Sequence, residues 1–345
     1  MDKTSKQPTI KDIAILAGTS LATVSWVLNG SSRKYVSPEL RERVLDAARV
    51  LNYQPNLIAQ RLRGKSRKMI AIIVPQFENI FFNHIVIGAE KLANHNGYQL
   101  LICSTDDNPE KELEMVNQLI ANWVDGILLI PTYEGAGAIN TVTRAGIPLV
   151  LLDRQIGTEF DFVGMDNYTP SYRAIRYLLE KGHRRIAYIG WDTPLHTLIE
   201  RNKGFMQAMS EFNIADANQW IQKCQRNPEA GYTLAKKVLN LQPTAIFIDQ
   251  NTIAEGVVKA IRDSRYKIPE DISVVIYGEP VWAVMNIPEF TCITLPDYRI
   301  GAEGAQILID KIEGKTGGQN QVIHLLGKIT ERGSVNELAA KEREV

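Results

Sequence analysis

The side chains best suited to recognition chemistry lie near the start of the chain. Four of them share one face of a helix predicted to begin after Ser20: Ala22, Ser25, Trp26 and Asn29. The opposite face is apolar and is expected to be buried. A helix that exposes short side chains in this way fits the DNA major groove, where small polar groups can reach base edges. An ordinary pair of packed helices would show the same periodicity, and that alternative stays open at this point.

Two short helices around a glycine turn must position these side chains. Thr9 and Asp12 have capping-box spacing at the start of the first helix. Gly18 can adopt the left-handed conformation that ends it, and Ser20 is a suitable N-cap for the second. The stripes expected to be buried are Ile10, Ile13, Ala14 and Ala17 in the first helix and Val24, Val27 and Leu28 in the second.

A third helix is predicted to complete a small core. Ser37 is its expected N-cap, and Pro38 occupies its first position, where a missing N–H has no cost. Its expected apolar stripe is Leu40, Val44, Leu45, Ala48 and Leu51.

Two segments of the chain resemble the lactose-repressor (LacI/GalR) family. Residues 9–30, with TIKDIA and TSLATVSWVLNG, are similar to that family's helix-turn-helix signature, and NYQPNLIAQRLRGKS at 52–66 is similar to its hinge. The similarity extends to about Ser334. It implies a DNA-binding headpiece over 8–52, a hinge over 53–66, a two-lobed effector-binding and dimerisation core over 67–334, and a short tail over 335–345.

The resemblance and the helix pattern together predict the DNA contacts. They are Thr9, Ser20, Leu21, Ala22, Thr23, Ser25, Trp26 and Asn29 in the headpiece, and Tyr53, Asn56, Ala59 and Leu62 at the hinge. Trp26 stands where the family commonly has arginine, so we expect less guanine recognition, unless Trp26 folds back onto the headpiece core. Residues 56–63 are too few for a stable isolated helix, so the hinge should fold only when paired on DNA, with Leu62 wedged into the minor groove.

The charge of the chain is unevenly distributed. The whole chain balances at 39 basic and 39 acidic residues, but residues 1–68 hold 13 Lys and Arg against 5 Asp and Glu, and the remainder holds 26 against 34. A basic headpiece on an acidic body is expected where only the headpiece contacts phosphates. A merely solvated charged surface does not explain this segregation.

Other features limit the class of protein. The three cysteines are odd in number and scattered, which is typical of a reduced cytoplasmic protein. The start of the chain has no apolar core for a signal peptide, and no apolar run is long enough to span a membrane. We therefore expect a soluble, cytoplasmic protein without a membrane partner.

Signatures of catalysis are weak. The segment Gly135-Ala136-Gly137-Ala138-Ile139-Asn140 starts like a dinucleotide fingerprint but has asparagine in place of the third glycine. The five histidines show no metal spacing, and His183 is expected in the turn before a strand. We predict no catalytic residue, metal or cofactor. A metabolic enzyme and a sugar-binding transport component remain as less supported alternatives.

From Arg67 onward, short apolar runs alternate with helical stretches. Strands are predicted at 69–75, 98–104, 126–131, 147–153, 185–191, 243–249 and 271–278. Helices between them include 109–122, 168–181, 199–212, 229–240 and 252–263. This alternation predicts parallel sheets covered on both faces. The fold class is thus α plus α/β: a helical headpiece followed by two doubly wound lobes similar to periplasmic sugar-binding proteins, with ligands at the carboxyl ends of the strands.

Several residues are candidates for binding a small effector in the cleft between the lobes. Asp153 ends a predicted strand, on the ligand side of the sheet. The resemblance places Phe81 and Phe82 at the ligand site and gives Arg201 the role of a hydrogen-bond donor to the effector, with Thr197 one helical turn earlier. Phe82 in the core, and Arg201 paired to a carboxylate, are the structural alternatives.

The second lobe departs from the family pattern at its ligand positions. Gln250 and Asn251 replace the usual Asn-Asp, Gly278-Glu279 replaces Asp-Asp, and Arg226 stands at an often aromatic position. Carboxylates usually accept the hydroxyl hydrogens of a neutral sugar. Losing them and gaining Arg226 indicates an anionic sugar derivative, unless Arg226 points to solvent. The predicted effector contacts are therefore Phe81, Phe82, Asp153, Thr197, Arg201, Arg226, Gln250, Asn251 and Glu279.

The assembly expected from these features is a homodimer. The tail after Ser334, VNELAAKEREV, is too short and too weakly apolar for a stable coiled coil that would hold a tetramer. A two-fold dimer predicts a near-palindromic double-stranded operator. The sequence thus predicts a transcriptional regulator, of the repressor type, whose DNA affinity is controlled by a sugar or sugar derivative.

Overall fold

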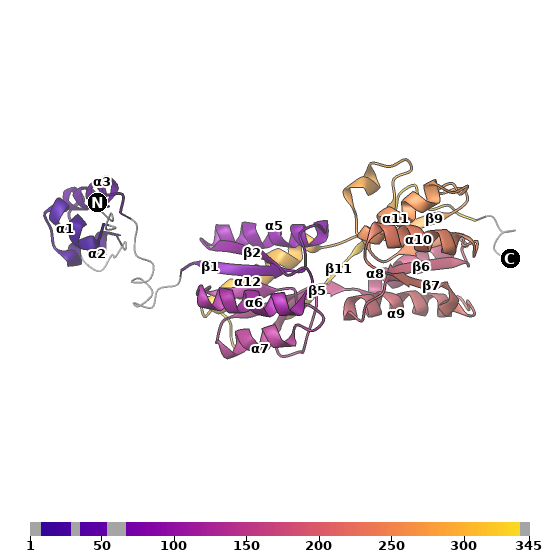
Figure 1. The fold of residues 1–345 in the computed structure, drawn as a ribbon, viewed down its shortest axis with the longest axis horizontal. Helices are drawn as coiled ribbons and strands as arrows, with labels where there is room; N and C mark the ends of the chain where they lie inside the picture. Colours follow the sequence, from indigo (N-terminus) through magenta and orange to yellow (C-terminus); the bar gives the residue numbers. More distant parts are fainter. Residues whose placement is uncertain (1–7, 29–34, 54–66, 339–345) are drawn as a thin grey trace, which may run out of the picture. The chain divides into compact units, whose positions relative to one another are not determined.

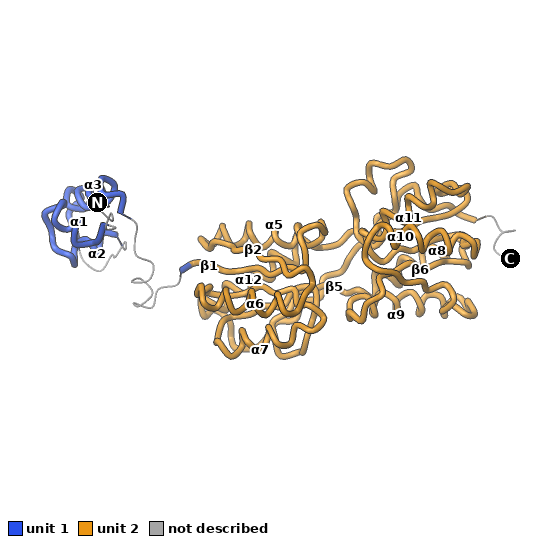
Figure 2. The backbone as a smooth tube through the Cα atoms, viewed as in Figure 1, with its two compact units in different colours: residues 1–67 blue, residues 68–345 orange. Residues whose placement is uncertain are grey.

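The chain forms two compact units, Met1–Arg67 and Lys68–Val345 (Figure 2). The computed structural model describes residues 8–28, 35–53 and 67–338. Asn29, Asn56, Ala59 and Leu62, which we predicted to contact DNA, lie outside the described residues. Each unit is described below by itself.

The first unit is built from helices α1 (Ile10–Ala17), α2 (Leu21–Leu28) and α3 (Pro38–Val50). Asp12 Oδ2 accepts a hydrogen bond from Thr9 N (2.8 Å), and Ser20 Oγ accepts one from Thr23 N (3.1 Å). Gly18 ends α1 with a φ of +61°, which a side chain would disfavour, and α1 and α2 then meet at 106°. The capping and turn predictions are confirmed, and the angle is that of a helix-turn-helix unit.

The core of this unit largely follows the expected stripes. Ile13, Val24 and Val44 are fully buried at its centre. The prediction for α3 was wrong at Leu45, which is 38% exposed, while Ala47 is buried instead. The register of a short helix is set by the helices it packs against, and its own sequence permits both stripes.

The second unit begins with a lobe built on a parallel sheet of strand order β11-β5-β4-β3-β1-β2 (Figure 1). Its strands are β1 (Met69–Val74), β2 (Gln99–Ser104), β3 (Gly126–Leu129), β4 (Leu149–Leu152), β5 (Asp161–Asp166) and β11 (Val322–Leu326). Its helices are α5 (Ile80–His95), α6 (Pro109–Ala121), α7 (Ala136–Arg144) and α12 (Asp297–Ile312). Side chains of β1 alternate between two buried clusters, with Ile72 in one and Ile73 in the other, so this sheet is covered on both faces.

The other lobe has the strand order β12-β10-β9-β8-β6-β7, with only β12 antiparallel within residues 68–338. Its strands are β6 (Ile186–Trp191), β7 (Ile221–Cys224), β8 (Ala245–Ile248), β9 (Ser273–Tyr277), β10 (Thr291–Thr294) and β12 (Lys328–Thr330). Its helices are α8 (Tyr168–Glu180), α9 (His196–Glu211), α10 (Pro228–Leu239) and α11 (Asn251–Arg262), with short 3₁₀ turns η1 (Ala217–Trp220) and η2 (Val281–Val284).

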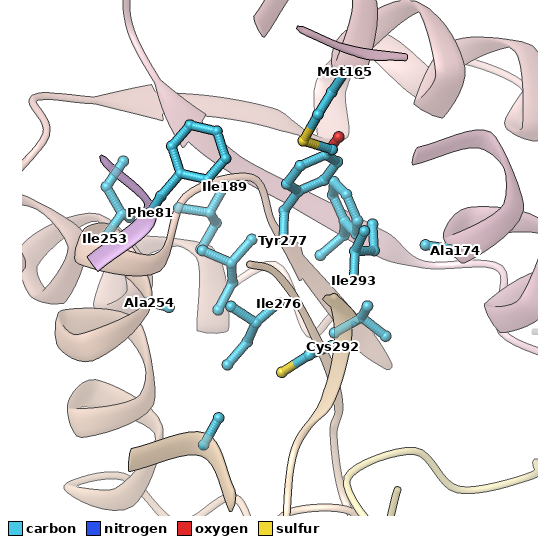
Figure 3. Packing of buried hydrophobic residues seen from close by; sticks show 14 of the residues in the cluster. Phe81, Met165, Ala174, Ile189, Ile253, Ala254, Ile276, Tyr277, Cys292 and Ile293 are labelled. Atoms are coloured by element: carbon cyan, nitrogen blue, oxygen red, sulfur yellow. The ribbon is translucent and has the colours of Figure 1, made fainter. Parts of the chain in front are cut away.

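Within residues 68–338 the chain passes between the lobes three times, after β5, after β10 and after β11. One cluster of buried hydrophobic residues includes members of both lobes, such as Phe81 of α5 and Tyr277 of β9 (Figure 3). The predicted fold class is confirmed. Each of the seven predicted strands is present in shortened form, and β5, β7, β10, β11 and β12 were not foreseen.

Candidate binding sites

A cavity lies between the lobes at the carboxyl ends of β4, β6, β8 and β9. Residues from both lobes line it: Asn79, Phe81, Phe82, Asp153, Arg154, Trp191, Leu195, Thr197, Leu198, Arg201, Arg226, Gln250, Asn251, Tyr277, Gly278 and Leu295. We call it the inner cavity.

Arg201 is fixed on one wall of the inner cavity by its own lobe. It lies on α9 and is 9% exposed. Its Nε donates to Asn167 Oδ1 (2.9 Å), its Nη1 donates to the Asp249 carbonyl (2.6 Å), and its guanidinium lies over the Tyr277 ring at 3.7 Å. A donor held this rigidly loses little conformational entropy when it binds a ligand.

Asp249, whose carbonyl accepts from this arginine, directly follows β8. Its carboxylate accepts hydrogen bonds from Tyr188 OH (2.7 Å) and Trp191 N (3.2 Å), and the residue is 1% exposed. Burial raises the pKa of Asp249 to about 6, although the nearby Arg201 charge acts in the opposite direction. The carboxylate therefore supports the cavity wall, and its charge is only weakly stabilised.

Asp153 directly follows β4 and lines the cavity from the other lobe. Its backbone adopts a φ of +57°, which is unusual for a residue with a side chain, and it is only 8% exposed. Among the described residues its carboxylate has no hydrogen-bond partner. Burial raises the pKa of Asp153, an effect opposed by Arg154 and Arg201. An acceptor in this unusual backbone conformation, which lines a cavity and has no protein donor, is typical of a binding site.

Arg226 extends from the second lobe to the first. Its Nη2 donates to Gln76 Oε1 (3.0 Å) and lies 3.4 Å from Asp107 Oδ2, while its guanidinium lies over the Trp191 ring at 4.2 Å. Asp107 also accepts two hydrogen bonds from Arg154, at 2.6 and 3.0 Å. The pKa of Asp107 is lowered because Arg154 and Arg226 outweigh its burial. The solvent-facing alternative for Arg226 is thus wrong, since its side chain is 11% exposed.

The amide side chains of the cavity cap helices and face each other across the lobes. Asn79 Oδ1 accepts from Phe81 N (3.1 Å) at the start of α5, and Gln250 Oε1 accepts from Thr252 N (3.0 Å) at the start of α11. Asn251 Nδ2 lies 3.4 Å from Asn79 Oδ1. These contacts join the two lobes by weak, neutral bonds that could exchange when the lobes move.

Most of the residues predicted to contact an effector are brought together here. Those lining the inner cavity are Phe81, Phe82, Asp153, Thr197, Arg201, Arg226, Gln250 and Asn251. Glu279 is not among the lining residues. Its carboxylate accepts a hydrogen bond from Thr294 Oγ1 (2.9 Å) and pairs with Arg332. Trp191, Tyr277 and Arg154 line the cavity but were not predicted, because each ends or follows an apolar run and reads as part of a core strand.

The first unit presents a different kind of surface. On α2 Leu21 and Ala22 are exposed, while Thr23, Ser25 and Trp26 are half-buried. Thr9 and Ser20 are exposed at the helix starts, and Tyr53 is half-buried after α3. The exposed turn of α2 therefore carries small and apolar side chains without charge, which can contact thymine methyl groups in the major groove.

His183, the histidine singled out in the sequence, has a structural role. His183 lies in the turn before β6, where its Nδ1 lies 3.1 Å from Thr244 Oγ1 and its Nε2 lies 3.1 Å from the Asn336 carbonyl. Burial lowers the pKa of His183 to about 4, so its ring is uncharged near neutral pH and serves to connect these two segments. Among the described residues no group of His, Cys, Asp and Glu could hold a metal ion, and no single helix could cross a membrane.

The chain matches two models of one protein family. Residues 67–328 match the model described as periplasmic binding proteins and sugar binding domain of LacI family, and residues 9–56 match bacterial regulatory proteins, lacI family. The HTH-type transcriptional repressor PurR of Histophilus somni (strain 129Pt) is 32% identical over 334 residues, covering 96% of this chain and 99% of the relative. PurR of Vibrio vulnificus (strain CMCP6) is 32% identical over 311 residues, covering 89% and 92%.

Solved structures show the same fold. The transcriptional regulator CelR in complex with cellobiose superposes with a TM-score of 0.72 at 26% identity, covering 95% of this chain and 99% of CelR. The lac repressor dimer bound to operator and the anti-inducer ONPF gives a TM-score of 0.83 at 24% identity, covering 96% and 100%. With the helix-turn-helix unit and the two-lobed core already in view, these matches show that the chain belongs to the lacI family of bacterial transcriptional regulators, a family of DNA-binding repressors and not of enzymes.

Proposed function

We propose that this chain is a homodimeric repressor of the bacterial cytoplasm, and that a sugar or sugar derivative in the inner cavity controls its affinity for a near-palindromic operator. The observation that carries the proposal is the joining of two distinct sites in one chain. A helix-turn-helix unit exposes α2, and a separate two-lobed unit holds buried, prearranged hydrogen-bonding side chains. Effector binding between the lobes would shift the population of states competent to hold the operator.

The DNA-binding part of the proposal rests on shape and charge. Leu21 and Ala22 form the exposed start of α2, where a recognition helix contacts base edges. The excess of basic residues over 1–68 would supply phosphate contacts, which position the protein without reading sequence.

The dimer part of the proposal rests on apolar side chains that are exposed on the surface of the two-lobed unit. They occur on α5 and β2 in one lobe and around η2 in the other: Ile87, Leu101, Ile102, Val281, Val284, Met285 and Ile287. Val281, Met285 and Ile287 lie close together in the sequence and are 60%, 76% and 98% exposed, and a group of exposed apolar side chains is typical of an interface. We expect sedimentation to show a dimer without DNA, and a stable tetramer would contradict this part of the proposal.

The effector part rests on complementary donors and acceptors. Arg201 offers donors from a rigid position, and the unpaired Asp153 carboxylate offers acceptors across the cavity. Sugar hydroxyls need both kinds of partner. That the relative CelR has been solved with cellobiose supports a carbohydrate ligand.

An anionic group on the effector is favoured by the charges near Arg226. Asp107 is held mainly by Arg154, at 2.6 Å, and lies 3.4 Å from Arg226 Nη2, so the Arg226 guanidinium can also pair with an anionic group of a ligand in the cavity that it lines. We expect Arg226→Ala to lower the affinity for a sugar acid or sugar phosphate about fivefold or more and that of the neutral parent sugar less than twofold. Equal losses for both would contradict the anionic effector.

The proposed function is tested by gel shift with the full chain and the DNA upstream of its own coding sequence. We expect a specific complex whose midpoint moves at least tenfold when one member of a panel of sugars, sugar acids, sugar phosphates and nucleosides is added. A chain that binds this DNA no better than random DNA would contradict the proposal. So would a specific complex that responds only to a nucleoside, because the effector would then be no sugar.

A further inference from the structure

A second cavity adjoins the inner cavity. Resting on the proposed function, we infer that this second cavity is a second subsite for the effector. The effector is then a molecule of two linked units, such as a disaccharide or an aryl glycoside. We call the second cavity the outer cavity. It is bounded by the loops after β3 and β4, by β5 and β11, and by the start of α9. Asp153, Arg154, Leu195 and Thr197 line both cavities, so the two spaces meet at these residues.

The free volumes of the two cavities differ about tenfold. The inner cavity holds about 50 Å³ of free space, whereas the outer cavity holds about 570 Å³. A water molecule takes a share of roughly 30 Å³ in the liquid, and small-molecule sites usually measure roughly 300–1,000 Å³. The outer cavity therefore has room for a second ring as it stands, whereas the inner cavity admits its sugar ring only when the lobes move apart.

The inner cavity is narrowed by Arg226. Its guanidinium lies on Trp191 and reaches the opposite lobe at Gln76 and Asp107. That contact closes the cavity on the side of β7 and α10. A ligand held by Arg201 can extend past Asp153, where the two cavities share their lining.

The junction between the cavities carries the clearest sign of a ligand. Asp153 is 8% exposed, has a φ of +57°, and makes no side-chain hydrogen bond within the described residues. It lines both spaces, so one carboxylate can accept from a hydroxyl on each of two linked rings. Because this carboxylate lines both cavities and has no protein donor, a ligand or water can complete its hydrogen bonding.

The outer cavity has the amphipathic wall that a sugar or aryl ring needs. Tyr133 is 58% exposed and Ile199 is 41% exposed at its rim, and the rings of Phe162 and His324 lie 5.4 Å apart. Such surfaces pack against the apolar face of a ring. Asp166 and Glu200 also line this cavity; one oxygen of each is held, by Thr169 N and by Lys203 Nζ, and the other oxygen can accept from a ring hydroxyl.

Isothermal titration calorimetry on the full chain tests this inference with matched probes: glucose with cellobiose, galactose with lactose, and the p-nitrophenyl β-glycoside of each monosaccharide. We expect at least one extended probe to bind at least tenfold more tightly than its monosaccharide. Ile199→Trp, which fills the outer cavity from an exposed position, should remove that advantage and leave the monosaccharide affinity within twofold. Ser210→Trp, also exposed on α9 but outside the lining, is the matched control.

The outcomes separate this inference from the proposed function. Equal affinity for short and extended probes, or an advantage that survives Ile199→Trp, would overturn the second subsite and leave the inner site intact. Equal losses in Ile199→Trp for short and extended probes would also overturn it. If no probe of either length binds, the sugar effector itself is contradicted, and the second subsite with it.

Discussion

The inner cavity and the exposed face of α2 prepare their side chains in opposite ways. In the cavity Arg201 is held by two hydrogen bonds and an aromatic ring, and Asp249 is held by two donors of its own. On α2 the exposed residues are Leu21 and Ala22. The N-cap Ser20 accepts a hydrogen bond from the α2 backbone, and this bond does not orient a side chain that could contact a base. The difference shows that the donors and acceptors of the cavity are fixed by the fold of one chain, whereas the exposed turn of α2 holds no fixed hydrogen-bonding group of this kind.

The largest expected effect comes from removing Arg201. Arg201→Ala should weaken effector binding by about 1.5–3 kcal/mol, which is roughly ten- to a hundredfold, because a charge-assisted contact is lost. Operator affinity should change less than twofold, since α2 belongs to the other unit. Calorimetry for the effector and anisotropy for the operator provide the two readouts. Arg176→Ala removes a half-exposed arginine on α8 and should change neither; an Arg201→Ala protein that loses operator binding would break the separation of the two surfaces.

The second effect concerns Leu62, which we predict to wedge into the minor groove. Leu62→Ala should weaken specific operator binding about tenfold or more, because the contacts that offset the unstacking of a base step are lost. Effector affinity of the free protein should stay the same. Anisotropy titrations on specific and random DNA measure the change. An unchanged affinity for the full operator would exclude the wedge.

The third effect is on the pH dependence of stability. The pKa of Asp249 in the fold is about 6, above its ordinary value of 3.8, so its stabilising contribution is complete below pH 3.8 and is lost as the pH rises through 6. The stability of the protein relative to Asp249→Asn should therefore fall between pH 4 and 7, by up to about 3 kcal/mol. Urea unfolding across this range gives the slope.

The contribution of Asp107 to stability, near Arg226, should depend on pH in the opposite direction. The pKa of Asp107 is lowered by its arginines, so its contribution is present above pH 3.8 and is lost as the pH falls below that value. Relative to Asp107→Asn, the protein should gain stability as the pH rises through this acid range. Because each slope is measured against the matching asparagine variant, it reports that one carboxylate. Parallel slopes for the two variants would show that the cavity charges are not held as described.

The smallest expected effect is a change in base preference when Trp26 on α2 is replaced. Trp26→Arg should introduce a guanine preference at one symmetric position of each half-site, worth about 1–3 kcal/mol of discrimination, because arginine can donate two hydrogen bonds to guanine. Trp26 is half-buried on α2, beside the exposed turn. Selection of operators from random DNA with both proteins measures it. Identical selected sites would show that position 26 reads no base.

Local sequence patterns were sufficient for the elements whose signal lies within a few residues. The caps at Thr9, Ser20 and Ser37, the glycine turn and the apolar central strands could all be predicted. The strands β5 and β7 were missed because they are short or interrupted by polar residues and glycine. Such strands form because a neighbouring strand pairs with them, and that pairing leaves no local pattern.

The candidate site shows the same limit. Asp153 was visible because a polar residue ended an apolar run, and Arg201 was indicated by its place in the family pattern. Glu279 was expected in the cavity, but Arg332, which lies 53 positions later on the chain, pairs with it instead. The bridge from Arg226 to Asp107 crosses from one lobe to the other, and no spacing in the sequence encodes that contact.

The central claim is that the cavity and the operator surface are coupled through one chain. Linkage requires the factor by which effector changes operator affinity to equal the factor by which operator changes effector affinity. We therefore expect the effector affinity of the free dimer and that of the operator-bound dimer to differ by roughly tenfold or more. The operator affinities measured with and without effector should differ by the same factor. In Arg201→Ala, at the same effector concentrations, neither affinity should change. Identical effector affinities in the free and the operator-bound dimer would contradict the claim.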